Sequence, residues 1–152
     1  MDRVPPTLTP QLDVDVPGEG MSIGEAAAAV GLSVQTLRYY EREGLLLDPT
    51  PRRSNGHRRF HRNDLDWLVG LVMLRETGMP IAQVRDVAAL SRISGTELQR
   101  LEAFEAHRET VVAQLKRTQE HLAALDTKIA AYRAYVAGEE VTIHHEQSPA
   151  GA

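Results

Sequence analysis

The feature that most constrains the fold is a pair of short helix signals with one tight turn between them. Ser22 opens a capping box, and the Ala-rich run behind it ends at Gly31, a residue type favoured at helix C-termini. Ser33 can cap a second helix over about 34–43, which ends at Gly44. Two short helices joined by so tight a turn are typical of a helix-turn-helix.

The second helix carries two chemically different faces. Val34 and Leu37 share the face that must point to the core. The other face carries an amide, two guanidinium groups and a phenol, which suit base edges and phosphate oxygens in a major groove. Its residues are Gln35, Arg38, Tyr39 and Arg42. The alternative is a solvated face, with its arginines paired to Glu41 or Glu43.

Charge is distributed unevenly along the chain. The 152 residues carry a net charge of -4, and the sequence pI of about 5.9 argues weakly against nucleic-acid binding. Residues 38–62, however, hold seven Arg against three acids and contain no Lys. Arg offers a planar fork suited to phosphates and guanine edges. A basic island inside an acidic chain therefore indicates an anionic partner.

The basic island contains a hairpin signal. Asn55-Gly56 is a strong turn dipeptide, because both residues tolerate positive φ. We expect a small two-strand wing over about 45–60, with Arg at its tip and on both arms. Such a wing would grip phosphates beside the helix-turn-helix, whereas a plain surface loop would leave the arginines repelling one another.

Two further helices are expected, over 62–77 and 81–90. The first has a core stripe of Leu65, Leu68, Val69, Val72 and Met73, and the second turns Ile81, Val84, Val87 and Leu90 inward. Trp67 lies off the first stripe and is expected to fill space between helices.

A long helix follows, over roughly 97–137. Counting from Leu101 in alternating steps of three and four residues gives eleven positions. Nine of them are apolar, and the exceptions are Arg108 and Thr118. A repeat of this period over five heptads predicts a coiled-coil seam about 60 Å long. A 70-residue domain cannot bury it, so a partner helix is expected; the alternative is a helix folded back on its own domain. The predicted dimerisation residues are Leu101, Phe104, Val111, Leu115, Leu122, Leu125, Ile129, Tyr132 and Val136.

The expected organisation has four parts. Residues 1–20 and 138–152 are expected to be disordered tails, 21–92 a winged-helix domain and 93–137 a dimerisation helix. The predicted fold class is mainly α, with a small two-strand wing.

Several functional classes find no support. Absence of Cys excludes thiolate metal sites, disulfides and a cysteine nucleophile. No phosphate loop or hydrolase motif occurs, so an enzyme is not expected, nor is a metal or cofactor. No membrane span or export signal is visible, which favours a cytoplasmic protein.

The run Thr36-Leu-Arg-Tyr-Tyr-Glu-Arg-Glu-Gly-Leu45, with the preceding Met21 to Val34, resembles the N-terminal signature of the MerR family of bacterial transcription regulators. The resemblance continues through Arg52, Gly56, Arg58, Phe60, Asp64, Leu65, Gly78 and Ile81. It implies a winged-helix dimer, paired through antiparallel helices, on a pseudo-palindromic promoter element. The family usually has Tyr where this chain has His57.

The resemblance also implies particular contacts and partners. Arg38, Tyr39, Tyr40, Arg42 and Arg58 become candidate DNA contacts. The full predicted DNA-binding set is Gln35, Thr36, Arg38, Tyr39, Tyr40, Arg42, Arg52, Arg53, Asn55, His57, Arg58 and Arg59. Such a regulator would distort the promoter spacer, act with RNA polymerase holoenzyme and associate with the nucleoid.

A small-molecule effector is expected where the long helix meets the head, near Trp67, Leu90 and Phe104. Two alternative functions stay open. One is a DNA-architectural or excisionase-like protein, and the other is a coiled-coil scaffolding protein with a basic head.

Overall fold

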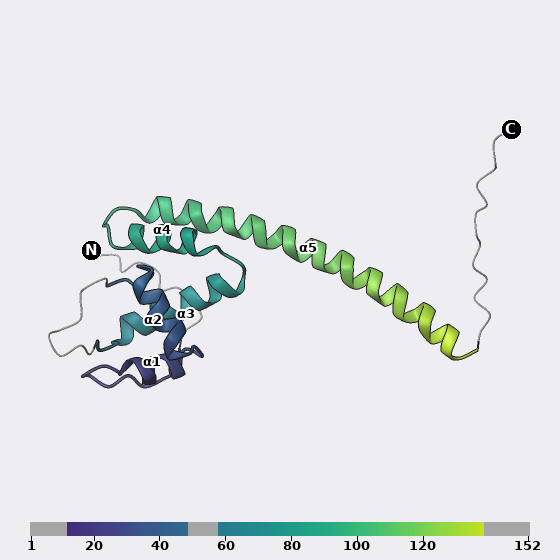
Figure 1. Ribbon diagram of the computed structural model, residues 1–152. Helices are drawn as coiled ribbons and strands as arrows, with labels where there is room; N and C mark the ends of the chain where they lie inside the picture. The colour runs from purple at the N-terminus through teal and green to yellow at the C-terminus, as the bar shows by residue number, and fades with distance from the viewer. Residues whose placement is uncertain (1–11, 49–57, 139–152) are drawn as a thin grey trace. The chain divides into compact units, whose positions relative to one another are not determined.

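The computed structural model describes residues 12–48 and 58–138 (Figure 1). These residues form a mainly helical fold, as predicted. The five helices are α1 (Ile23–Ala29), α2 (Val34–Arg42), α3 (Arg62–Glu76), α4 (Ile81–Ser91) and α5 (Glu97–Val136). The chain divides into two compact units between Val111 and Val112, and α5 contributes to both. We call the first unit the head.

The first two helices are defined by their caps, as the sequence predicts. The Ser22 side chain accepts a hydrogen bond from the Glu25 amide at 3.2 Å, and the Glu25 carboxylate accepts one from the Ser22 hydroxyl. The Ser33 side chain accepts from the Thr36 amide at 3.0 Å. Gly31 lies between the helices with φ of +73°, a left-handed conformation that glycine adopts without strain.

The core of the head is built around α3. Its buried side chains are Leu65, Trp67, Leu68, Leu71 and Leu74. The expected stripe was only partly right, because Val69, Val72 and Met73 are half-buried. Other parts of the head cover α3 on more than one side: Tyr40 and Met79 pack with Leu71, whereas Val87 packs with Trp67. The buried face is therefore wider than one helical stripe.

Only part of the wing predicted over about 45–60 falls within the described residues. Its tip lies outside the described residues, and 45–48 does not form a strand. Within the described ranges, the only bridge pairs Met21 with Phe60, whose amides and carbonyls exchange hydrogen bonds of 2.7 and 2.8 Å. The arm that begins at residue 58 is thus paired with the chain before α1 rather than with 45–48.

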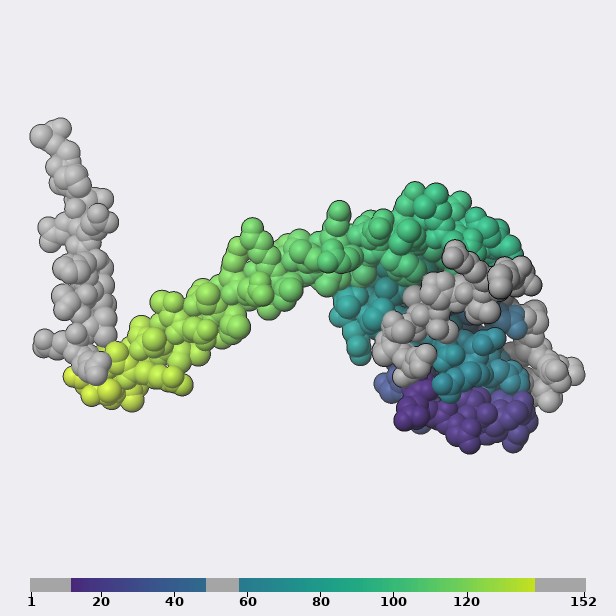
Figure 2. Space-filling view, turned by 180° about the vertical axis from the view of Figure 1, so that it is seen from behind, coloured from purple at the N-terminus to yellow at the C-terminus, as the bar shows by residue number. Residues whose placement is uncertain are grey.

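The N-terminal segment 12–20 is also different from the prediction. It was expected to be disordered, but Leu12, Val14 and Val16 pack against the hydrophobic core beside Phe60. The Arg62 guanidinium at the start of α3 donates to the carbonyls of Val14 and Leu12, at 2.6 and 2.8 Å. In Figure 2 the purple N-terminal part of the described chain lies directly against the teal surface of the head.

Candidate nucleic-acid interface

The outward face of α2 carries the polar side chains that the sequence assigned to DNA. Gln35, Arg38, Tyr39 and Arg42 are all exposed, and Tyr39 retains 38% of its accessible surface. Gln35, Arg38 and Arg42 make no hydrogen bond or ion pair with any other described residue. Leu37, on the opposite face, is completely buried. The helix is therefore anchored by one face and presents unpaired donors on the other.

Two predicted contacts of α2 lie differently. Tyr40 is only 7% exposed and packs with Leu45, Leu71 and Met79, so its ring is a core side chain. Thr36 is half-buried, and its hydroxyl accepts a hydrogen bond of 2.9 Å from Ser33. Both residues serve first to hold α2 in place.

Arg58 was predicted to be a DNA contact on the wing, and its side chain is 13% exposed in the structure. Its guanidinium donates to the Asp48 carbonyl at 2.7 Å and lies over the Phe60 ring, 5.3 Å from the ring centroid. It also lies 3.9 Å from Glu41 and 3.7 Å from Asp64. Arg58 thus ties α2, residue 48 and the first turn of α3 together inside the head.

Arg59 is held by the N-terminal segment. Its Nε donates to the Glu19 carbonyl at 3.2 Å, and a terminal nitrogen donates to the Gly20 carbonyl at 2.6 Å. The remaining predicted DNA contacts lie outside the described residues: Arg52, Arg53, Asn55 and His57.

Residues 43–48, which we call the connector, join α2 to the wing region and contain an unusual set of hydrogen bonds. All six of its backbone carbonyls accept hydrogen bonds from side chains. Those of Glu43 and Leu45 accept from Arg85 at 2.9 Å and from the Trp67 indole at 2.7 Å. Arg92 donates to Gly44, Leu46 and Leu47, and Arg58 donates to Asp48.

Sequence reasoning missed Arg85 and Arg92. A signal was present, since the two arginines are seven residues apart and so lie on one side of a helix. Their side chains supply donors to four connector carbonyls, of which the Leu46 carbonyl is bound at a part-buried position and the other three at exposed positions.

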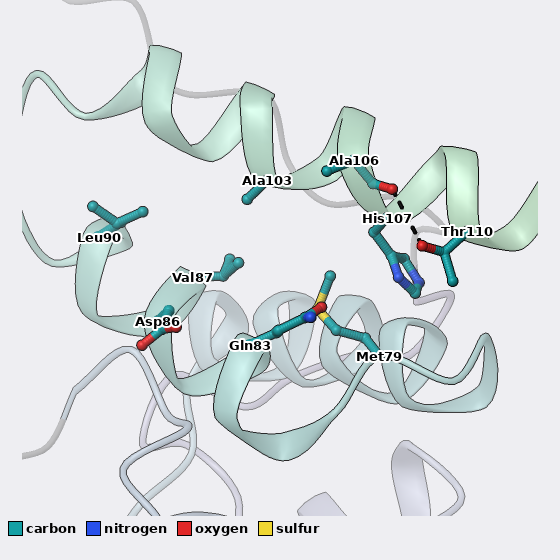
Figure 3. A pocket seen from close by; sticks show the side chains of 9 residues that line it. All are labelled: Met79, Gln83, Asp86, Val87, Leu90, Ala103, Ala106, His107 and Thr110. Atoms are coloured by element: carbon teal, nitrogen blue, oxygen red, sulfur yellow. Dashed lines mark hydrogen bonds between the residues drawn. The ribbon is translucent and has the colours of Figure 1, made fainter.

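Of the three residues expected near an effector, Phe104 packs against the cluster that contains Trp67, whereas Leu90 lines a separate pocket. Trp67 is buried and uses its indole N–H for the Leu45 carbonyl, whereas Phe104 packs against core residues of the head. The expectation that Trp67 fills space between helices is confirmed. A pocket of about 210 Å³ does lie between α4 and α5 (Figure 3). Leu90 lines it, together with Met79, Gln83, Asp86, Val87, Ala103, Ala106, His107 and Thr110.

The predicted seam of α5 is exposed over most of its length. Leu115, Leu122 and Leu125 retain 54–56% of their surface. Leu101, Ile129, Tyr132 and Val136 are also exposed. Phe104 and Val111 are half-buried within the head, so the free apolar stripe belongs mainly to 112–136.

Other classes of site find no support in the described part of the chain. No group of three or more potential ligands is placed to hold a metal ion among residues 12–48 and 58–138. Within the same ranges, no helix is long and apolar enough to cross a membrane.

A capped helix-turn-helix with an exposed polar face defines a DNA-binding head, and comparison with known proteins agrees. The family model described as MerR HTH family regulatory protein matches residues 21–91. An uncharacterized HTH-type transcriptional regulator from Haemophilus influenzae is 36% identical over 110 residues, which is 72% of this chain and 81% of that protein.

Two solved structures are similar to this chain. One, from Listeria monocytogenes, is a MerR family transcriptional regulator with a TM-score of 0.70 and 33% identity, covering 78% of this chain and 90% of the other. The second is HiNmlR, a MerR family regulator lacking the sensor domain, bound to promoter DNA. It has a TM-score of 0.68 and 35% identity, and the match covers 78% of this chain and 96% of that one. The chain belongs to the MerR family of DNA-binding helix-turn-helix transcriptional regulators.

The position of Arg58 generates a prediction about its role. Arg58→Ala should lower the free energy of unfolding by about 1–3 kcal/mol, because it removes a mostly buried guanidinium with several partners. Urea unfolding measures this loss. The matched change Arg42→Ala, at an exposed and unpaired arginine, should stay within about 0.5 kcal/mol of the wild type. Equal effects of the two substitutions would contradict the assignment.

Proposed function

We propose that this chain binds a pseudo-palindromic promoter element as a homodimer and distorts the DNA between the two half-sites. The observation that carries the proposal is the α2 face of Gln35, Arg38, Tyr39 and Arg42, exposed and held from behind by Leu37. Amide and guanidinium groups on a helix of this kind can read base edges, and the remaining donors can bind phosphates. Promoter DNA bound to the similar HiNmlR supports this choice of ligand.

The homodimer is supported by the apolar residues of 112–136, which remain exposed in a single chain. Apolar residues that repeat along a helix at this spacing form the seam of a coiled coil. A second copy of α5 is the partner with matching length and pattern, so the scaffolding alternative requires an additional protein for which nothing here provides evidence.

The charges on α5 favour antiparallel pairing. A parallel seam would place Arg108 against Arg108 of the second copy, inside the contact. An antiparallel seam with Leu115 opposite Leu125 of the second copy places Arg108 opposite Tyr132, where a cation–π contact can form. The same register sets Glu105 beside Arg133, and both pairs occur twice by symmetry.

Antiparallel pairing of two such chains supplies two DNA-binding heads related by a two-fold axis. Heads of this kind bind half-sites on one face of the duplex, about one helical turn or a multiple apart. Bending a site of this size costs on the order of 1–6 kcal/mol, which contacts at both half-sites can offset. A distorted spacer would realign the promoter elements for RNA polymerase, in the cytoplasm at the nucleoid.

The proposed function is tested with the promoter DNA upstream of the chain's own coding sequence. A gel shift should show specific binding to an element with two-fold symmetry, and circular permutation of that element should show a bend near its centre. Binding without sequence preference would instead favour the architectural alternative. A straight operator at saturating protein would replace distortion with simple occlusion of the promoter.

The dimer has a separate test. Leu115→Arg with Leu122→Arg should yield a monomer, because the seam would have to bury unpaired charges. The control is Ala124→Arg with Ala131→Arg, which adds the same charge on α5 away from the seam and should leave the dimer intact. Sedimentation measures the mass, and only the seam variant should also lose operator affinity. A dimer that survives the seam substitutions would show that α5 pairs elsewhere.

A further inference from the structure

Helix α4 holds the connector from one side, through two arginines. Arg85 donates from Nε to the Glu43 carbonyl at 2.9 Å and also pairs with the Glu43 carboxylate. Arg92, at the C-terminal end of α4, donates to the carbonyls of Gly44 and Leu47 at 2.7 and 3.2 Å, and to Leu46. One helix therefore binds four of the six connector carbonyls.

The connector is a sensitive point in a DNA-binding head. It begins at Glu43, which caps the C-terminus of the recognition helix α2. It ends at Asp48, whose carbonyl binds Arg58 on the far side of the wing region. A shift of these six residues would therefore change the angle between α2 and the arm at residue 58, even with the core unchanged.

The same end of α4 is joined to the start of α5. Thr96 is buried in the turn between the helices, and its hydroxyl contacts the carbonyls of Leu90 and Ile93 at 2.6 and 2.8 Å. Arg92 lies inside this turn. A movement of the α4–α5 turn would consequently reach the connector through a single guanidinium group.

We propose that Arg92, supported by Arg85, is a positioning residue that sets the geometry between the recognition helix and the wing region. This inference rests on the proposed function, since its consequence is a defined fit to DNA. Arg92 is an exposed residue, but its Nε and one terminal nitrogen are engaged within the head, where they donate to three carbonyls. The planar fork of Arg is required, because the single ammonium of Lys cannot span the same three acceptors.

The first experiment uses the free protein. Hydrogen exchange should be measured by mass spectrometry in the wild type, Arg92→Gln and Arg92→Lys, with Arg117→Lys on exposed α5 as the matched control. The amides of Gly44 and Leu45, which bond to the carbonyls of Glu41 and Tyr40, should exchange about tenfold faster in both Arg92 variants. Protection in α1 and α3 should not change. Unaltered exchange at the connector would overturn the proposal.

The second experiment uses operator DNA and the charge-conserving Arg92→Lys. The ratio of specific to nonspecific affinity should fall by about tenfold or more, and the bend angle of the DNA should change. Both effects are expected because the recognition helix and the wing region would no longer be held at the angle that fits the operator. The salt slope should stay within about half a unit of the wild type, since no phosphate contact is lost. Loss of folded protein alone would change neither the ratio nor the bend angle.

The two experiments distinguish the failure of this inference from that of the proposed function. A salt slope lower by about one, with unchanged ratio and bend, would make Arg92 a phosphate contact and refute its positioning role. A wild-type protein that binds no operator would refute the proposed function, and the exchange measurement would still decide whether Arg92 positions the connector.

Discussion

The geometry of the head depends on how six consecutive backbone carbonyls find hydrogen-bond donors. The connector, residues 43–48, is neither helix nor strand, yet Leu45 and Leu46 within it are almost fully buried. The Leu45 carbonyl is bound in the buried interior, where an unpaired carbonyl would be costly, and the Leu46 carbonyl at a part-buried position, whereas the other four bonds are exposed. Here Arg58, Trp67, Arg85 and Arg92 provide the donors. The C-terminal end of the recognition helix is thereby held in place by side chains of α3 and α4 and by Arg58.

This requirement divides the arginines of the basic island into two groups. Arg58, Arg59 and Arg62 bind carbonyls or carboxylates of their own chain. Arg38 and Arg42 are exposed and make no such contact within the described residues. Counting seven arginines as one DNA-binding surface therefore overestimates what the described part of the island offers to phosphates. The internal arginines instead determine where the exposed arginines lie, because they hold the helix that carries the exposed side chains.

Much of this fold follows from local sequence signals. Ser22, Ser33 and Gly31 define α1 and α2 because capping and left-handed turns depend on residues close in the chain. The outward face of α2 is equally predictable from its spacing. Exposure of Leu115 and Leu122 likewise agrees with the heptad pattern, although it does not establish pairing.

The features that the sequence did not reveal depend on residues that lie far apart in the chain. Arg58 and Arg92 look like any surface arginine, and only their distance to connector carbonyls reveals their roles. Tyr40 lies at the boundary of two helix faces, and α3 and residue 79 decide that it is buried. The N-terminal segment had a readable signal in the alternation of Leu12, Val14 and Val16 with acids, which is typical of an extended half-buried segment.

The most direct test of this account is arginine-specific chemical modification, read residue by residue with and without operator DNA. Arg38 and Arg42 should react fast in the free protein and become protected when the operator binds. Arg58 should react slowly in both states, because its guanidinium group is mostly buried and already bound within the head. Protection of Arg58 by DNA, with Arg38 and Arg42 still reactive, would contradict the assignment of the α2 face as the DNA-binding surface.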